Sequence, residues 1–221
     1  MGYGIVIRVW GDYACFTRPE MKVERVSYDV ITPAAARGII ESVYWKPSIQ
    51  WIIDKIHVLN DIEFTNIRRN EVSKKISTRN VNKIMKQNRG KLFYLNSNDN
   101  RQQRSAMVLK NVDYVIEAHF DLISDKAGPE DTVEKHYNMA LRRFRKGQHF
   151  HAPCLGTREF GAKVKLIEDG NIPSSQLTGP RDLGWMLYDM DYSDQENIQP
   201  IFFNAELQDG VLDLTQVDLV R

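Results

Sequence analysis

Apolar residues in the first part of the chain fall into short runs that turn-forming residues separate. The runs Ile5–Trp10 and Ile49–Leu59 are rich in β-branched and aromatic residues, which is typical of strands. Between them, Thr32–Trp45 opens with a threonine suited to an N-cap and a proline suited to the first helical turn. Pro47 disfavours helical geometry in the residue before it, so we expect this helix to end close to Trp45.

The second half of the chain repeats this order of elements. Ala106–Ile123 alternates between apolar and polar residues and predicts strand structure. Apolar residues then recur at helical spacing from Val133 to Phe144, and Gly147 follows as a natural stop. Ala162–Glu168 again alternates between apolar and polar residues and predicts a further strand. The order strand, helix, strand, strand, helix, strand is that of the ferredoxin-like fold, whose sheet often leaves one face open to RNA.

Residues 66–104 interrupt this order, because they are polar, basic and rich in Asn, Ser and Gln. Such a stretch is too long for an ordinary connection and indicates an excursion from the core. A hairpin or flexible arm that contacts nucleic acid fits its charge. A disordered loop fits equally well, and both interpretations stay open.

The last part of the chain predicts further strands, with a hairpin turn at Asp209-Gly210. We therefore expect an α+β protein with two parts. Residues 1–168 are predicted to form a ferredoxin-like RNA-binding and catalytic domain that carries the excursion at about 66–104. Residues 169–221 are predicted to form a small β-rich region with an antiparallel sheet.

Charge is strongly segregated along the chain although the formal net charge is only +1. Residues 66–91 carry nine Lys or Arg and one acid, and residues 135–165 carry eight against one. Residues 181–221 carry two against nine. One basic run alone would indicate a solvated face. Two basic runs with an acidic end predict a polarised surface that attracts a polyanion, and nucleic acid is the leading candidate.

Several classes of protein fit the sequence poorly. No apolar run approaches the roughly 20 residues that a membrane-spanning helix needs. The first residues lack a basic leader, so we expect a cytoplasmic protein with reduced thiols at Cys15 and Cys154. His149 and His151 lie near Cys154 but lack an obvious fourth metal ligand. We expect neither a metal nor another cofactor.

His136 follows Lys135 at the edge of the apolar stripe of its predicted helix. A surface pair is the commoner explanation of such neighbours. The alternative is a catalyst for RNA cleavage by the RNA's own 2′-hydroxyl, which requires a base, an acid and a cation near the phosphate. Histidine can act as base or acid near neutral pH, Tyr and Lys can supply the other roles, and this chemistry needs no metal.

Three stretches carry a resemblance to a known family: "GDYACFTRPE", "ESVYWKP" and "EKHYNMALRRFRKGQHFHAPCLGTREFGA". Together they resemble the CRISPR-associated RAMP superfamily, specifically the processing endoribonuclease of subtype I-C, the Cas-five d-type (c-type) family. The resemblance spans most of the first 165 residues. It implies a ferredoxin-like domain and a smaller C-terminal β region. It also implies metal-independent cleavage of precursor CRISPR RNA at the base of each repeat hairpin, after which the guide RNA stays bound in the surveillance complex.

The same resemblance implies a catalytic set of Tyr44, Lys135 and His136. Tyr44 lies in the matching motif "SVYWKP", and the other two lie in "EKHY". Lys135 would stabilise the charge of the pentavalent phosphate, and Tyr44 would orient the imidazole or share the proton transfer. Which of Tyr44 and His136 is the base stays open. Without the family, Tyr44 would be interpreted as a core or capping aromatic.

Basic residues in the two basic runs, together with one near Tyr44, are the candidate contacts to nucleic acid: Lys46, Arg68, Arg69, Lys74, Lys75, Arg142, Arg143, Arg145, Lys146 and Arg158. The expected partners are precursor CRISPR RNA and the other subunits of the subtype I-C complex, with duplex DNA as a further ligand of the same surface and no membrane. The alternative function is a non-catalytic, nucleic-acid-binding assembly subunit of that complex.

Overall fold

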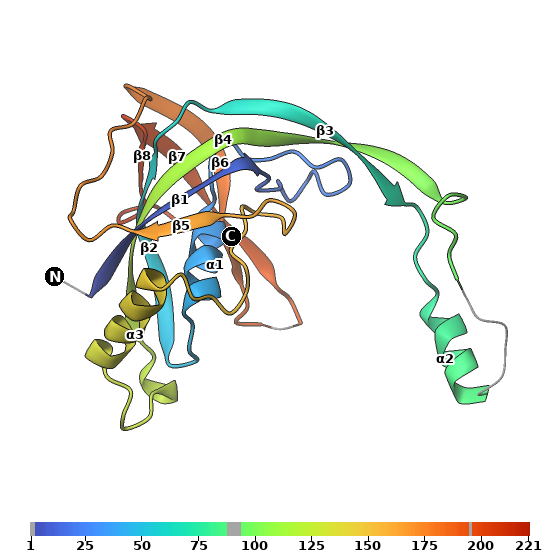
Figure 1. The fold of residues 1–221 in the computed structure, drawn as a ribbon, viewed down its shortest axis with the longest axis horizontal. Coiled ribbons are helices and arrows are strands. Elements are labelled where there is room, and N and C mark those ends of the chain that lie inside the picture. The colour runs from blue at the N-terminus through green and yellow to red at the C-terminus, as the bar shows by residue number, and fades with distance from the viewer. Residues whose placement is uncertain (1–2, 88–93, 195) are drawn as a thin grey trace.

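The computed structural model describes residues 3–87, 94–194 and 196–221 (Figure 1). In chain order the elements are β1 (Gly4–Ala14), α1 (Pro33–Val43), β2 (Ile49–Val58), β3 (Glu63–Val72), α2 (Thr78–Gln87), β4 (Arg101–Leu122), the 3-10 helix η1 (Ser124–Lys126), α3 (Val133–Arg145), β5 (Lys163–Leu166), β6 (Pro180–Asp191), β7 (Gln199–Gln208) and β8 (Val211–Asp213). Within these ranges, none of the helices is long and apolar enough to span a bilayer.

One antiparallel sheet organises the described residues, in the order β5-β1-β4-β2-β8-β7-β6, with β3 paired to β4 outside this path. Helices α1 and α3 lie on the same side of the sheet (Figure 1). Alternate residues of the central strands face these helices, among them Ile7 of β1, Trp51 of β2 and Ile116 of β4. They pack with Ile40 of α1 and Phe144 of α3 into one core. The chain is therefore an α+β protein built on an antiparallel sheet, as the sequence predicts.

Helix α1 begins as its sequence predicts and ends two residues before the expected point. The Thr32 side chain accepts a hydrogen bond from the backbone N of Ala35 at 3.3 Å, which satisfies one free N–H of the first turn. The helix ends at Val43, and Tyr44 already has extended backbone angles, φ −146° and ψ 115°. Tyr44 is therefore no longer helical, and its side chain does not follow the direction of the side chains in α1.

The excursion is a long hairpin whose far end carries a helix. Strand β3 pairs along its whole length with the first part of β4, from Glu63–Lys110 to Val72–Arg101. Figure 1 shows this pair running away from the body, with α2 at its outer end. The hairpin interpretation is confirmed for the paired strands, and α2 is an element that the sequence did not predict. Residues 88–93 of the predicted excursion lie outside the described ranges, and we call the described part, residues 63–87 and 94–110, the arm.

The C-terminal strands are present and antiparallel, and they extend the main sheet. Strand β8 pairs with β2 and joins β7 and β6 to it. The predicted turn at Asp209-Gly210 is confirmed, because both residues have positive φ, 50° and 76°, between β7 and β8. A division into two domains at about residue 168 stays a prediction.

Gly156 allows the loop after α3 to pack closely against the residue that follows β1. Its φ is +85°, and a Cβ at this position would overlap the carbonyl oxygen of Cys15. We expect Gly156→Ala to lower the free energy of unfolding by about 1–3 kcal/mol, measured by urea denaturation. Gly161→Ala in the same loop is the matched control, because a Cβ there meets nothing within 4 Å. Its effect should stay within about 0.5 kcal/mol. Equal effects of the two variants would contradict this account.

Candidate active site

The end of α1 places the Tyr44 hydroxyl inside the molecule. The residue is only 1% exposed, and its carbonyl oxygen accepts a hydrogen bond from the indole N of Trp51 at 2.9 Å. Its ring lies under the guanidinium of Arg143, 5.5 Å from ring centroid to the central carbon. Trp51 and Arg143 therefore fix both the backbone and the ring of Tyr44.

His136 meets this hydroxyl from the first turn of α3. The Thr132 side chain caps the helix by accepting from the backbone N of Lys135 at 3.2 Å, which sets where the helix begins. His136 is 2% exposed, and its Nδ1 lies 2.7 Å from the Tyr44 hydroxyl oxygen. The ring of Phe120 lies edge to face with the imidazole, and the two ring centroids are 6.3 Å apart. Two of the predicted catalytic residues thus form a buried hydrogen-bonded pair, although 92 positions separate them.

The second ring nitrogen of His136 also has polar neighbours. Its Nε2 lies 3.3 Å from a carboxylate oxygen of Asp131 and 3.4 Å from the Ser48 hydroxyl. A carboxylate can only accept, so we infer that Nε2 carries the proton and that the Tyr44 hydroxyl donates to Nδ1. Both ring nitrogens are therefore engaged by groups of the protein itself.

Lys135 lies near the same carboxylate oxygen of Asp131 as His136 does. Its side chain is 45% exposed, and its Nζ is 3.8 Å from the Asp131 carboxylate. Nζ also donates to the backbone carbonyl oxygen of Glu130 at 3.1 Å. Asp131 therefore lies within 4 Å of both His136 and Lys135, whereas Tyr44 contacts the other ring nitrogen of His136.

Burial controls the protonation of the Tyr44–His136 pair. Loss of solvent lowers the pKa of His136, and the positive charges of Lys135 and Lys46 act in the same direction, while Asp131 opposes them. Burial raises the pKa of Tyr44, and Arg143 opposes this shift. Near neutral pH the site therefore holds a neutral imidazole beside a neutral phenol.

Asp131 and Ser48 were missed in the sequence, although both contact His136. The pKa of Asp131 is lowered chiefly by a hydrogen bond from the backbone N of Gly128, and His136 and Lys135 lower it further. The available signal was a carboxylate four residues before Lys135, directly ahead of the N-cap. Nothing in the sequence indicates that Ser48, which follows a proline, would lie near this group.

The candidate nucleic-acid contacts divide into paired and exposed side chains. Arg69 pairs with Glu159, Arg145 pairs with Glu168, and Arg143 donates to the carbonyl oxygen of Val43 at 3.0 Å. The remaining candidates are exposed: Lys46, Arg68, Lys74, Lys75, Arg142, Lys146 and Arg158. Three of them lie on the arm, and the others lie in segments around α3 and the end of α1.

Among the residues that the structure describes, the paired histidines after α3 belong to no cluster that could hold a metal. His149 and His151 are exposed, and Cys154 is partly buried. Throughout the described ranges, three or more His, Cys, Asp or Glu side chains are nowhere arranged to hold a metal ion.

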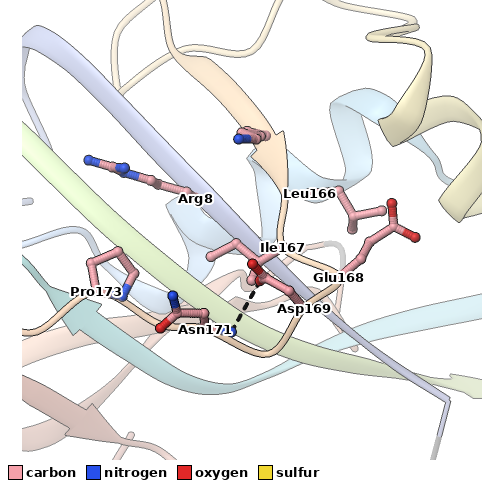
Figure 2. A pocket seen from close by; sticks show the side chains of 8 residues that line it. Arg8, Leu166, Ile167, Glu168, Asp169, Asn171 and Pro173 are labelled. Atoms are coloured by element: carbon pink, nitrogen blue, oxygen red, sulfur yellow. Dashed lines mark hydrogen bonds between the residues drawn. The ribbon is translucent and has the colours of Figure 1, made fainter.

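A separate hollow of about 350 Å³ lies where β1 and β5 meet the segment after β5 (Figure 2). Arg8 lines it, and its guanidinium donates two hydrogen bonds to the Asp113 carboxylate, at 3.0 and 2.6 Å. Asp169 at the rim accepts from the backbone N of Asn171 at 3.1 Å (Figure 2). The charged side chains that line the hollow are of both signs, and some of them already have hydrogen-bond partners within the protein. The hollow therefore offers no excess positive charge to a polyanion.

The lowered pKa of His136 gives a measurable pH dependence. An NMR titration of its ring protons, assigned with a His136→Gln variant, should give a midpoint below the ordinary value of about 6.5. The unfolded chain then binds this proton more readily than the folded one. Stability should therefore fall as the pH drops from about 6.5 towards the folded-state pKa, and rise with pH across that window. A midpoint at or above 6.5 would overturn this account of the burial.

Comparison with known proteins agrees with the resemblance seen in the sequence. Residues 4–215 match the family model described as CRISPR-associated protein (Cas_Cas5). A protein of Mannheimia succiniciproducens named CRISPR pre-crRNA endoribonuclease Cas5d is 53% identical over 218 residues, covering 97% of this chain and 96% of its own length. A protein of the same name from Thermus thermophilus is 37% identical over 225 residues, covering 94% of this chain and 90% of its own length.

A solved structure titled "Crystal Structure of CRISPR-associated Protein" superposes with a TM-score of 0.69 at 24% identity, covering 96% of this chain and 92% of that one. The expected family is thereby confirmed, and the chain belongs to the Cas5d branch of the CRISPR-associated Cas5 proteins.

Proposed function

We propose that this protein is an endoribonuclease that cleaves precursor CRISPR RNA in the cytoplasm, at the base of the repeat hairpin, and then stays with the guide RNA. The names of its two relatives support the reaction class. The single observation that carries the proposal for this chain is the 2.7 Å contact between the Tyr44 hydroxyl and His136 Nδ1, with Lys135 on the same helix turn.

The neutral imidazole suits the role of general base. In the proposed reaction His136 takes the proton of the 2′-hydroxyl through Nε2, and the oxygen attacks the adjacent phosphorus. This step uses the imidazole tautomer that carries its proton on Nδ1, and the Tyr44 oxygen then accepts a hydrogen bond from Nδ1–H and keeps the ring oriented. The imidazolium then returns a proton to the leaving 5′-oxygen, so that a cyclic phosphate and a 5′-hydroxyl result. Lys135 stabilises the negative charge that develops on the phosphate.

The arrangement of the strands supports a ferredoxin-like description of the main domain. Leaving out the arm and the C-terminal strands, the elements run β1, α1, β2, β4, α3, β5. Their order in the sheet is β5-β1-β4-β2, which is fourth, first, third, second, and every pair is antiparallel. We infer that residues 1–168 form this domain and that the arm is an insertion between its second and third strands.

The arm also favours a second role, which is assembly with other subunits of the surveillance complex. Met85 of α2 is 73% exposed, and the side chains of Val81, one turn earlier in α2, and of Ile76, just before the helix, are exposed as well. Basic residues share this segment, including Lys74 and Lys75. Apolar and basic groups together suit a surface that contacts a neighbouring subunit and the RNA it holds. This role accompanies cleavage and could exist without it.

The catalytic assignment can be tested with a labelled repeat hairpin. His136→Ala should slow cleavage by about 10²–10⁴-fold while RNA affinity changes little, because the imidazole acts on the proton and not on binding. A 2′-deoxy substitution at the scissile nucleotide should stop the reaction of the wild-type protein, and excess EDTA should leave it unchanged. Full activity of the His136→Ala variant, or strict dependence on an added divalent ion, would refute the proposed mechanism.

The arm lysines should contribute to RNA binding through the phosphate backbone. Replacing both Lys74 and Lys75 with Ala should reduce the slope of log affinity against log salt by about 1.4–1.8, since each phosphate contact contributes roughly 0.7–0.9. Lys22 and Lys126 are exposed lysines outside the two basic runs, and their double replacement is the control. Equal slopes for the two double variants would exclude the arm from the RNA interface.

A further inference from the structure

The carboxylate of Asp131 occupies the position where the proposed reaction needs a phosphate. It lies 3.3 Å from His136 Nε2 and 3.8 Å from Lys135 Nζ. Carboxylates and phosphates are both anions that accept hydrogen bonds from the same charged and neutral donors. The base and the cation of the proposed mechanism therefore already share an anionic partner, and that partner is part of the chain.

The Asp131 side of the imidazole is the side from which RNA can arrive. Tyr44, on the Nδ1 side, is buried almost completely, whereas the side chain of Asp131 is 27% exposed. The contact with Asp131 also holds the proton on Nε2, and a protonated nitrogen cannot accept the proton of a 2′-hydroxyl. As it stands, the pair is both covered and in the tautomer that is unsuited to a base.

We propose that Asp131 is a built-in substitute for the scissile phosphate, which closes the active site until RNA displaces it. This inference rests on the proposed endoribonuclease function. When RNA displaces the carboxylate, its phosphate lies against Lys135 and its 2′-hydroxyl faces Nε2. The imidazole then exchanges its proton through solvent, losing it from Nε2 and gaining one on Nδ1, where the N–H donates to the Tyr44 oxygen. His136 is then competent to accept the 2′-hydroxyl proton at Nε2. Asp131 is a regulatory residue in this scheme and does not take part in the chemical step.

The segment that carries Asp131 is held mainly by local contacts. The backbone N of Gly128 donates to the Asp131 carboxylate at 3.0 Å, and the backbone N of Asp131 donates to the Gly128 carbonyl oxygen at 3.0 Å. Gly128, Pro129 and Glu130 are exposed. An outward movement of this turn between η1 and α3 would therefore expose little of the core, which is the property expected of a segment that opens at low cost.

A closed state reduces the apparent affinity for any anion in proportion to the fraction of molecules that are open. Removing the negative charge at residue 131 should raise that fraction. For the Asp131→Asn variant we expect inorganic phosphate to bind about three- to tenfold more tightly, followed through the His136 ring protons by NMR. The same variant should lower the KM for a repeat hairpin by a similar factor while kcat stays within twofold of wild type.

Asp125→Asn is the matched control, because Asp125 is an exposed carboxylate of η1 just ahead of this turn. It should change neither measurement. Asp131→Ala serves as a second variant, and the melting temperature of each variant shows whether it is folded. Unchanged phosphate affinity in both folded Asp131 variants would overturn the inference. So would a kcat loss above tenfold at constant KM, because that result assigns Asp131 to positioning of His136.

Failure of this inference differs from failure of the proposed function. The phosphate titration needs no cleavage and reports on the anion site alone. If wild-type protein does not cut the hairpin, or if His136→Ala still cuts it, the nuclease function fails whatever the Asp131 variants do. If wild-type protein cuts, His136→Ala does not, and the Asp131 variants behave like wild type, only the closure by Asp131 fails.

Discussion

The hydrogen bond between the Tyr44 hydroxyl and His136 Nδ1 is the contact on which the candidate active site depends. It joins the end of α1 to the beginning of α3, and each end must stop at the right residue for the two atoms to meet. Helix α1 ends at Val43 because Tyr44 adopts extended angles, and Trp51 of β2 holds its carbonyl oxygen. Helix α3 begins at Val133 because Thr132 caps it. The sheet brings the end of α1 and the beginning of α3 together, and the Tyr44–His136 hydrogen bond forms as a result.

Local features of the fold were predictable because their causes are local. The cap at Thr32, the turn at Asp209-Gly210 and the apolar stripe of α3 are each written within a few neighbouring residues. Helix α2 was missed although Val81, Ile84 and Met85 stand at helical spacing, because this apolar face is short and lies within a polar, basic stretch. The pairing of β8 with β2 joins segments far apart in sequence, and a pattern along the chain cannot specify such a contact.

The candidate site shows the same division between what is local and what is spatial. Tyr44, Lys135 and His136 were chosen by resemblance to a family, and the structure brings all three to one place. Asp131 carried only a weak local signal, its place directly ahead of the N-cap of α3. Ser48 carried none, because only tertiary packing brings the residue before β2 to His136 Nε2. The charge runs show a similar limit. Arg69 and Arg145 belong to basic segments, yet each already has an acidic partner from a distant part of the chain.

His136, the proposed base, is 2% exposed, so it cannot contact its substrate without a rearrangement, and this requirement has a consequence for selectivity. Opening the site costs free energy, and contacts that the ligand makes elsewhere on the protein must offset this cost. A long RNA can do so, because its phosphates can reach the exposed lysines and arginines of the arm and of α3 at the same time. A short oligonucleotide that reaches only His136 and Lys135 lacks those contacts. In such a site, remote binding energy is used to assemble the catalytic groups, so substrate length and shape affect the rate of cleavage as well as affinity. The buried position of His136 would then protect unrelated RNA from cleavage, because a brief encounter with one phosphate does not open the site.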